Sequence, residues 1–174
     1  MTVHSLTRRD FSVRLAAALS AIGLPLSIAR AATSAQGTGD GISRNAESIH
    51  QEVPFRATPG RIYEALLDAK RFSHATGGMP AEINREAGGA FSLFGGLIKG
   101  RNIALVPNTR IVQAWRAGSW TDTGIYSIAR FELKAQGAGT LLVFDHTGFP
   151  KGEAEHLAAG WKSNYWDNLQ KALA

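Results

Sequence analysis

The sequence predicts an α+β fold, in which a series of antiparallel strands is followed by one long C-terminal helix. Between residues 48 and 147, most segments alternate apolar and polar side chains, as strands with one buried face do. Pairs such as Gly-Gly and Pro-Asn separate these segments, as hairpin turns do. Residues 153–174 instead carry apolar and aromatic side chains at helical spacing, without a proline.

The first predicted elements are a strand and two short helices. Residues 48–55 alternate apolar and polar side chains and are predicted as an edge strand. Thr58 is a suitable N-cap, and Pro59 suits the first position of the helix that follows. A second short helix, which includes Phe72, is expected to end at the glycines of residues 77–78.

The remaining strands are separated by turn residues and lead to the closing helix. They are predicted at 81–85, 90–94, 98–106, 110–117, 123–134 and 141–147. In the closing helix, predicted over 153–174, Leu157, Trp161 and Tyr165 follow one another at intervals of four residues. Such residues project from one face of a helix, so this face is expected to cover either a solid core or a cavity.

Strand alternation indicates which side chains face the interior. In the last strand Leu142, Phe144 and His146 share one face, and Asp145, a poor core residue, lies on the other. The matching faces of the neighbouring strands are also mostly apolar, which predicts an apolar cavity with a few polar groups, as in small-molecule sites. The candidate cavity residues are Gln113, Trp115, Ser127, Phe131, Phe144, His146, Trp161 and Tyr165.

Two of these assignments have a structural alternative. His146 could transfer protons near neutral pH, or it could be hydrogen-bonded at the end of its strand. The structural role is favoured, because no orienting partner stands at a convincing spacing. Trp115, Trp120 and Trp161 could grip a planar or acyl ligand, or they could fill the core of a small domain.

The first 31 residues have the features of an export signal. Arg8 and Arg9 are followed by Phe11 and by an Ala-rich apolar run over 15–28, and residues 29–31 offer a small-x-small cleavage pattern. This arrangement resembles the twin-arginine export signal, with an ordinary secretion signal or an uncleaved anchor as alternatives. The resemblance implies export by the twin-arginine machinery to the bacterial periplasm or beyond, with no stable membrane insertion after cleavage.

Residues 32–47 are polar and of low complexity, so they are expected to form a flexible linker ahead of a domain at 48–174. The formal net charge of the chain is +5. The first 31 residues contribute +3 of it, and the basic residues of the remainder are scattered among acidic ones. Nucleic acid is therefore not expected as a partner. The chain has no Cys, which excludes thiol catalysis and disulfides, and its His spacing predicts neither a metal site nor a cofactor.

An ordered series of motifs extends over most of the chain after residue 49. It comprises Thr58-Pro59-Gly60-Arg61-Ile62-Tyr63, Gly88-Gly89-Ala90-Phe91, Pro107-Asn108-Thr109-Arg110, Gly139-Thr140-Leu141-Leu142, Gly160-Trp161 and Tyr165-Trp166. In this order the chain resembles the AHSA-type domains (activator of heat-shock protein 90 ATPase homologue-like) of the SRPBCC, or START-like, superfamily. The resemblance implies the helix-grip fold: a curved antiparallel sheet wrapped round a long C-terminal helix, with two short helices after the first strand.

Three functions are compatible with this resemblance, because the superfamily places many functions on one scaffold. The leading hypothesis is an exported domain that binds a hydrophobic small molecule between the sheet and the C-terminal helix. The alternative is an enzyme of the cyclase or aromatase kind, which uses the same cavity with His146 as acid or base. The third, less favoured, is co-activation of a chaperone ATPase. The sequence does not identify the ligand, a reaction or an oligomeric state.

Overall fold

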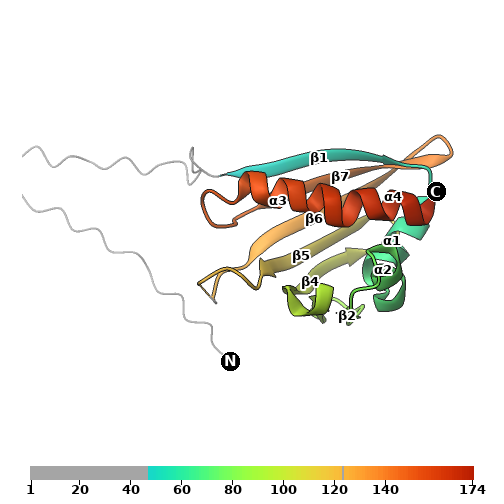
Figure 1. The fold of residues 1–174 in the computed structure, drawn as a ribbon. Coiled ribbons are helices and arrows are strands. Elements are labelled where there is room, and N and C mark those ends of the chain that lie inside the picture. Colours follow the sequence, from blue (N-terminus) through green and yellow to red (C-terminus); the bar gives the residue numbers. More distant parts are fainter. Residues whose placement is uncertain (1–46, 123) are drawn as a thin grey trace, which may run out of the picture. The chain divides into compact units, whose positions relative to one another are not determined.

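The structure is a computed structural model, and it describes residues 47–122 and 124–174. In this part of the chain a seven-stranded antiparallel sheet has the strand order β1-β7-β6-β5-β4-β3-β2 (Figure 1). Its strands are β1 (Ser48–Phe55), β2 (Glu82–Ile83), β3 (Ala90–Leu93), β4 (Ile98–Val106), β5 (Arg110–Ala117), β6 (Ser127–Gln136) and β7 (Gly139–Thr147). From β2 to β7 each strand pairs with the next along the chain, whereas β1 pairs with β7.

The helices lie in two places. Two short helices, α1 (Pro59–Leu67) and α2 (Ala69–Ala75), follow β1, and a 3₁₀ turn, η1 (Phe94–Gly96), follows β3. After β7, α3 (Ala154–Gly160), the π-helical segment η2 (Trp161–Trp166) and α4 (Asp167–Leu173) run on as one long helix. This helix lies along one face of the sheet, and α1 and α2 lie near its C-terminal end (Figure 1). The α+β, helix-grip fold is thus confirmed.

Local chemistry sets the ends of the short helices. Pro59 occupies the first turn of α1, where its missing N–H has no intrahelical partner to lose. Asp68 separates α1 from α2 and caps α2, because its carboxylate accepts a hydrogen bond from the Arg71 backbone N–H at 2.9 Å. That hydrogen bond lowers the pKa of the Asp68 carboxyl.

The core lies between the sheet and the long helix. Leu142, Phe144 and His146 are all buried on the inner face of β7, and the alternate residues of β6 and β5 are buried with them. On the other face of β6, Ile128 and Arg130 are exposed. The alternation of side chains predicted this division between the two faces.

The bounds of several elements differ from the prediction, and for two strands the local hydrogen bonds explain the difference. The strand expected at 81–85 has only two residues, because the Asn84 side chain accepts a hydrogen bond from the Glu86 N–H and turns the chain. The strand expected at 123–134 begins at Ser127. Before it, Asp122 accepts from the Gly124 N–H and makes a second turn. Residue 123 itself lies outside the described residues.

The predicted export signal, with Arg8 and Arg9, and the predicted linker up to residue 46 also lie outside the described residues. Within the described part, β1 begins at Ser48, and Glu47 accepts a hydrogen bond from the Gly152 N–H at 2.8 Å. No helix among the described residues is long and apolar enough to cross a membrane.

Candidate functional site

A pocket of about 310 Å³ lies between the first half of the long helix and the β4–β5 part of the sheet. Its volume is near the lower end of the range of about 300–1,000 Å³ that is usual for small-molecule sites. The walls come from the segment before β2, from η1, from the start of β4, from the end of β5 and the loop after it, and from the long helix. The lining residues are Met79, Phe94, Leu97, Ile98, Trp115, Ala117, Ser119, Glu153, His156, Leu157, Gly160, Trp161, Asn164 and Tyr165.

Most of this lining is apolar. Trp115, Trp161 and Tyr165 are buried and form the inner wall, with the Trp161 and Tyr165 ring centroids 4.2 Å apart. Leu97, 62% exposed, marks the mouth. The lining has one carboxylate and one imidazole, Glu153 and His156, both from the start of the helix. The arrangement suits an uncharged, largely apolar molecule.

Two polar atoms that belong to residues of the inner wall are buried and unpaired. Among the described residues, the Trp115 indole N–H and the Tyr165 hydroxyl are buried without a hydrogen-bond partner. Burial raises the pKa of the Tyr165 hydroxyl, against a smaller opposing effect of the nearby Trp115 N–H. The hydroxyl therefore stays protonated, and the two atoms lie near each other without meeting hydrogen-bond geometry. We call them the pocket donors.

His146 lies deeper, in a closed chain of hydrogen bonds. The Trp161 indole N–H donates to His146 Nδ1 at 3.0 Å, so Nδ1 carries no proton. The neutral ring then carries its proton on Nε2, which donates to Ser127 Oγ at 2.7 Å. Ser127 Oγ in turn donates to the Trp115 backbone carbonyl at 2.8 Å. Each side-chain nitrogen and oxygen in this series of hydrogen bonds therefore has a partner.

The surroundings of His146 favour the structural role. The side chain is fully buried, and desolvation lowers its pKa from 6.5 to about 4, so the imidazole is neutral near pH 7. Acid–base catalysis needs a ring nitrogen that can reach a substrate, and both nitrogens are already bonded. His146 also does not line the pocket. The geometry gives no support to the cyclase-like alternative.

Three of the eight candidate cavity residues line the pocket: Trp115, Trp161 and Tyr165. The other five, Gln113, Ser127, Phe131, Phe144 and His146, are buried in the core away from its walls. Gln113 donates to the Asn102 side chain at 3.1 Å, and Asn102 donates to the Asn84 backbone carbonyl at 2.9 Å. This network ties β4 and β5 to the turn after β2.

The packing of the aromatic rings explains why only three of the eight candidate residues line the pocket. Phe144 packs against Trp161 with centroids 4.3 Å apart, and Phe131 packs against Phe144 at 5.1 Å. These rings fill the space between β6, β7 and the helix. The pocket between the first half of the helix and the sheet therefore lies on the β4–β5 side.

The π-helical segment brings a further ring inward. In a π-helix the hydrogen bonds join residues five apart, so such residues come to lie nearly above one another. Trp161 and Trp166 are five apart, and their rings are stacked with an interplanar angle of 18°. Trp166 is buried, although α-helical spacing would turn it away from Trp161.

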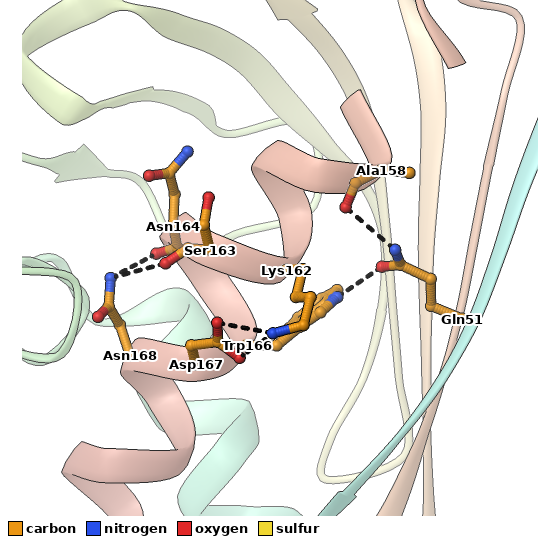
Figure 2. Close-up of polar contacts among 8 residues, drawn as sticks. All are labelled: Gln51, Ala158, Lys162, Ser163, Asn164, Trp166, Asp167 and Asn168. Atoms are coloured by element: carbon orange, nitrogen blue, oxygen red, sulfur yellow. Dashed lines mark hydrogen bonds and ion pairs between the residues drawn. The ribbon is translucent and has the colours of Figure 1, made fainter. Parts of the chain in front are cut away.

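Gln51 of β1 holds this segment against the sheet (Figure 2). Its side-chain amide donates to the Ala158 backbone carbonyl at 3.1 Å and accepts from the Trp166 indole N–H at 2.6 Å. Neither Gln51 nor Trp166 was among the site residues predicted from the sequence. The adjacent bulky pair Tyr165-Trp166 is the signal that could have revealed the π-helical turn, because a regular α-helix cannot bury both rings on one narrow face.

A curved antiparallel sheet gripping a long C-terminal helix, with a pocket between them, defines a START-like, SRPBCC-type domain. The comparisons identify the family. The chain belongs to the family of activator of Hsp90 ATPase homolog 1-like proteins, whose model matches residues 56–174.

Curated relatives agree with this assignment. An activator of 90 kDa heat shock protein ATPase homolog from Dictyostelium discoideum is 32% identical over 129 residues, which cover 74% of this chain and 33% of the relative. The human homolog 1 is 27% identical over 122 residues, which cover 68% of this chain and 35% of the relative. The chain thus spans about a third of the length of these relatives.

Solved structures share the fold. An HSP90 activator from Plasmodium falciparum superposes with a TM-score of 0.68 at 26% identity, covering 72% of this chain and 95% of that one. The protein CalU16 from Micromonospora echinospora superposes with a TM-score of 0.62 at 22% identity, covering 74% and 77%. The second likeness is one of fold alone.

Proposed function

We propose that this protein binds a hydrophobic small molecule in the pocket beside the C-terminal helix. The observation that supports this most strongly is the pocket itself, about 310 Å³ of mostly apolar space next to two buried, unpaired donors. A domain selected only for stability would fill such a space and pair such donors, because both features are costly. Binding a ligand offsets both costs.

Gly160 offers a way to close the pocket without disturbing the core. It lines the pocket and has helical backbone angles, and a Cβ added there would meet nothing closer than the Asn164 side-chain nitrogen at 3.8 Å. Gly160→Leu therefore places a bulky side chain at the pocket wall, and Gly160→Ala is the matched control. Each substitution replaces a helical glycine, and this replacement by itself stabilises the helix by about 0.5–1 kcal/mol.

The experiment is a fluorescence titration of the purified domain with N-phenylnaphthylamine, a neutral apolar dye. The wild type and Gly160→Ala should bind the dye with enhanced emission, and Gly160→Leu should bind it at least about tenfold more weakly, a loss of about 1.4 kcal/mol. Unchanged binding by Gly160→Leu would place the dye elsewhere and count against the pocket. No binding by the wild type would count against the function itself.

We also propose that the domain acts outside the cytoplasm. The support is the sequence pattern around Arg8 and Arg9, which resembles a twin-arginine signal. Replacing both residues by Lys in the full chain should leave the protein in the cytoplasmic fraction of a bacterial host, whereas the wild type should appear in the periplasm. Equal periplasmic amounts of both proteins would contradict export by the twin-arginine route.

A second candidate function follows from the relatives' names. The relative that is 32% identical is named an activator of a heat-shock protein ATPase, so this domain could stimulate a chaperone of that class. The match covers only a third of that relative, and export would separate the domain from cytoplasmic ATP. A steady-state ATPase assay with purified Hsp90 decides the matter: stimulation that persists in Gly160→Leu would favour this candidate over ligand binding.

A further inference from the structure

The chemistry of the inner wall restricts what the pocket can hold. We infer that the ligand is an uncharged, mainly apolar molecule with one hydrogen-bond acceptor, such as a ketone, ester or ether oxygen, which accepts from both pocket donors. This inference rests on the proposed function, because it specifies the ligand of the same pocket. Two observations support it: the polar atoms that are unpaired, and the charged side chains that the lining contains or lacks.

The unpaired atoms are donors. The Trp115 indole nitrogen can only donate, and the Tyr165 hydroxyl has a proton to donate because burial keeps it un-ionised. Their proximity means that one acceptor atom can approach both. An acceptor is thus the group that the inner wall lacks, and a ligand that is a pure hydrocarbon would leave both donors unpaired.

The neighbouring indole N–H groups already have acceptors, which limits the donors that a ligand can reach. Trp161 and Trp166 already donate to His146 Nδ1 and Gln51 Oε1, at 3.0 and 2.6 Å. Their N–H groups are therefore not available to a ligand. Of the aromatic residues that line the pocket, Trp115 and Tyr165 are the two that offer a donor.

The charges exclude two classes of ligand. Among the described lining residues there is neither Lys nor Arg, and His156 is exposed, so a carboxylate or phosphate at the inner wall would be buried without a counter-ion. A cationic amine would find the Glu153 carboxylate at the start of α3, but would place no acceptor near the inner wall. A neutral oxygen satisfies both donors and brings no charge into the pocket.

The pocket donors are closed to solvent in this structure. Binding therefore needs a small rotation of the Tyr165 or Trp115 side chain, which opens the donor toward the pocket.

The test uses two probes of the same shape, benzophenone and diphenylmethane, which differ in having a carbonyl or a methylene between two phenyl rings. Affinities are measured by calorimetry on the wild-type domain and on Tyr165→Phe, which removes only the hydroxyl. The ratio of the two affinities is compared between the proteins, so that the different hydrophobicity of the probes cancels. The preference for the ketone should fall about fivefold in Tyr165→Phe, as expected for one lost hydrogen bond.

A second readout needs no variant. In a proton–nitrogen correlation spectrum of the labelled wild type, the four Trp side chains give separate indole N–H signals. Benzophenone should move the Trp115 signal downfield, and diphenylmethane should not. The signals of Trp161 and Trp166, which are already hydrogen-bonded, serve as internal references.

The outcomes separate the two proposals. If both probes bind, Gly160→Leu abolishes binding, and neither the affinity ratio nor the Trp115 signal depends on the carbonyl, the pocket binds apolar molecules and this inference is wrong. If neither probe binds the wild type at its solubility limit, the proposed function fails and this inference fails with it. A carbonyl-dependent Trp115 shift together with the fivefold change supports both.

Discussion

The two sides of the C-terminal helix face the same sheet but are built differently. Toward β1, β6 and β7, which we call the sealed side, rings fill the space, and the Trp161 and Trp166 indoles donate to His146 and Gln51. Toward β4 and β5, the pocket side, the helix borders about 310 Å³ of open volume. There the Trp115 N–H and the Tyr165 hydroxyl, within the described residues, have no partner.

The two sides should therefore contribute differently to the stability of the domain. Each satisfied hydrogen bond in a core contributes about 0.5–1.5 kcal/mol, whereas a buried unpaired group costs about 1–3 kcal/mol. The sealed side therefore stabilises the domain and the pocket side destabilises it, a cost that the proposed ligand would offset. Substitutions on the two sides should have effects of different size and, in one case, of opposite sign.

The largest effect is expected from a cavity on the sealed side. Phe144 is fully buried and packs against Trp161, Trp166 and Phe131. Phe144→Ala should lower the free energy of unfolding by about 3–5 kcal/mol, measured by urea denaturation. The control at the mouth of the pocket, Leu97→Ala, should change it by less than about 0.5 kcal/mol. Equal losses would show that the two sides do not differ in packing.

The next effect is a dependence of stability on pH. The pKa of His146 is 6.5 in the unfolded chain and about 4 in the folded one, so the unfolded state binds the proton more tightly. Stability is therefore fully present above pH 6.5 and falls by about 3 kcal/mol as the pH is lowered to about 4.

The measurement compares the wild type with His146→Gln by urea denaturation between pH 4 and pH 7, the window set by this pKa. The difference between the two proteins isolates His146 from the carboxyl groups that also titrate there. His74→Gln, at an exposed position of α2, is the control for the His-to-Gln substitution outside the core. A wild type and His146→Gln with parallel pH profiles would contradict a neutral, buried imidazole.

A smaller effect is expected where Gln51 joins β1 to the π-helical segment. Gln51→Leu leaves the Trp166 indole N–H without its partner and removes one of the hydrogen bonds to the Ala158 carbonyl, which should cost about 2 kcal/mol. Gln170→Leu removes one exposed hydrogen bond to the Pro54 carbonyl and should cost less than about 0.5 kcal/mol. Thermal unfolding of the two variants would show whether Gln51 has this role, and similar losses would deny it.

The smallest effect has the opposite sign. Tyr165→Phe removes an unpaired hydroxyl from the pocket side and should raise the free energy of unfolding of the ligand-free domain by about 1 kcal/mol. Trp166→Phe, on the sealed side, removes a paired donor and should lower it. Losses of stability in both variants would mean that the Tyr165 hydroxyl has a partner in solution.

Much of the fold could be predicted from local patterns. Alternation and tight turns placed β4 at Ile98–Val106 and β5 at Arg110–Ala117, because a half-buried strand needs a period of two over its whole length. The short strand β2 was overestimated, because the turn at Asn84 depends on where its side chain bonds. Such side-chain turns leave little trace in hydrophobic periodicity.

The site was less predictable. Strand alternation identified Trp115 as inward-facing and helical spacing identified Trp161, but neither pattern could say which inward space is filled and which stays open. That depends on the packing of rings from β6, β7 and the helix. The role of Gln51 could not be foreseen either, since it is 107 residues before its acceptor Ala158, a carbonyl of α3 ahead of the π-helical segment.

The central claim is that the pocket side exists to hold a small apolar molecule. The most direct measurement is native mass spectrometry, with organic extraction, of the wild type and Gly160→Leu purified from the same bacterial host. The wild type should carry a reproducible neutral adduct that is extractable into solvent, and Gly160→Leu should lack it. An adduct-free wild type whose mass is also unchanged by added lipids and aromatic compounds would contradict the central claim.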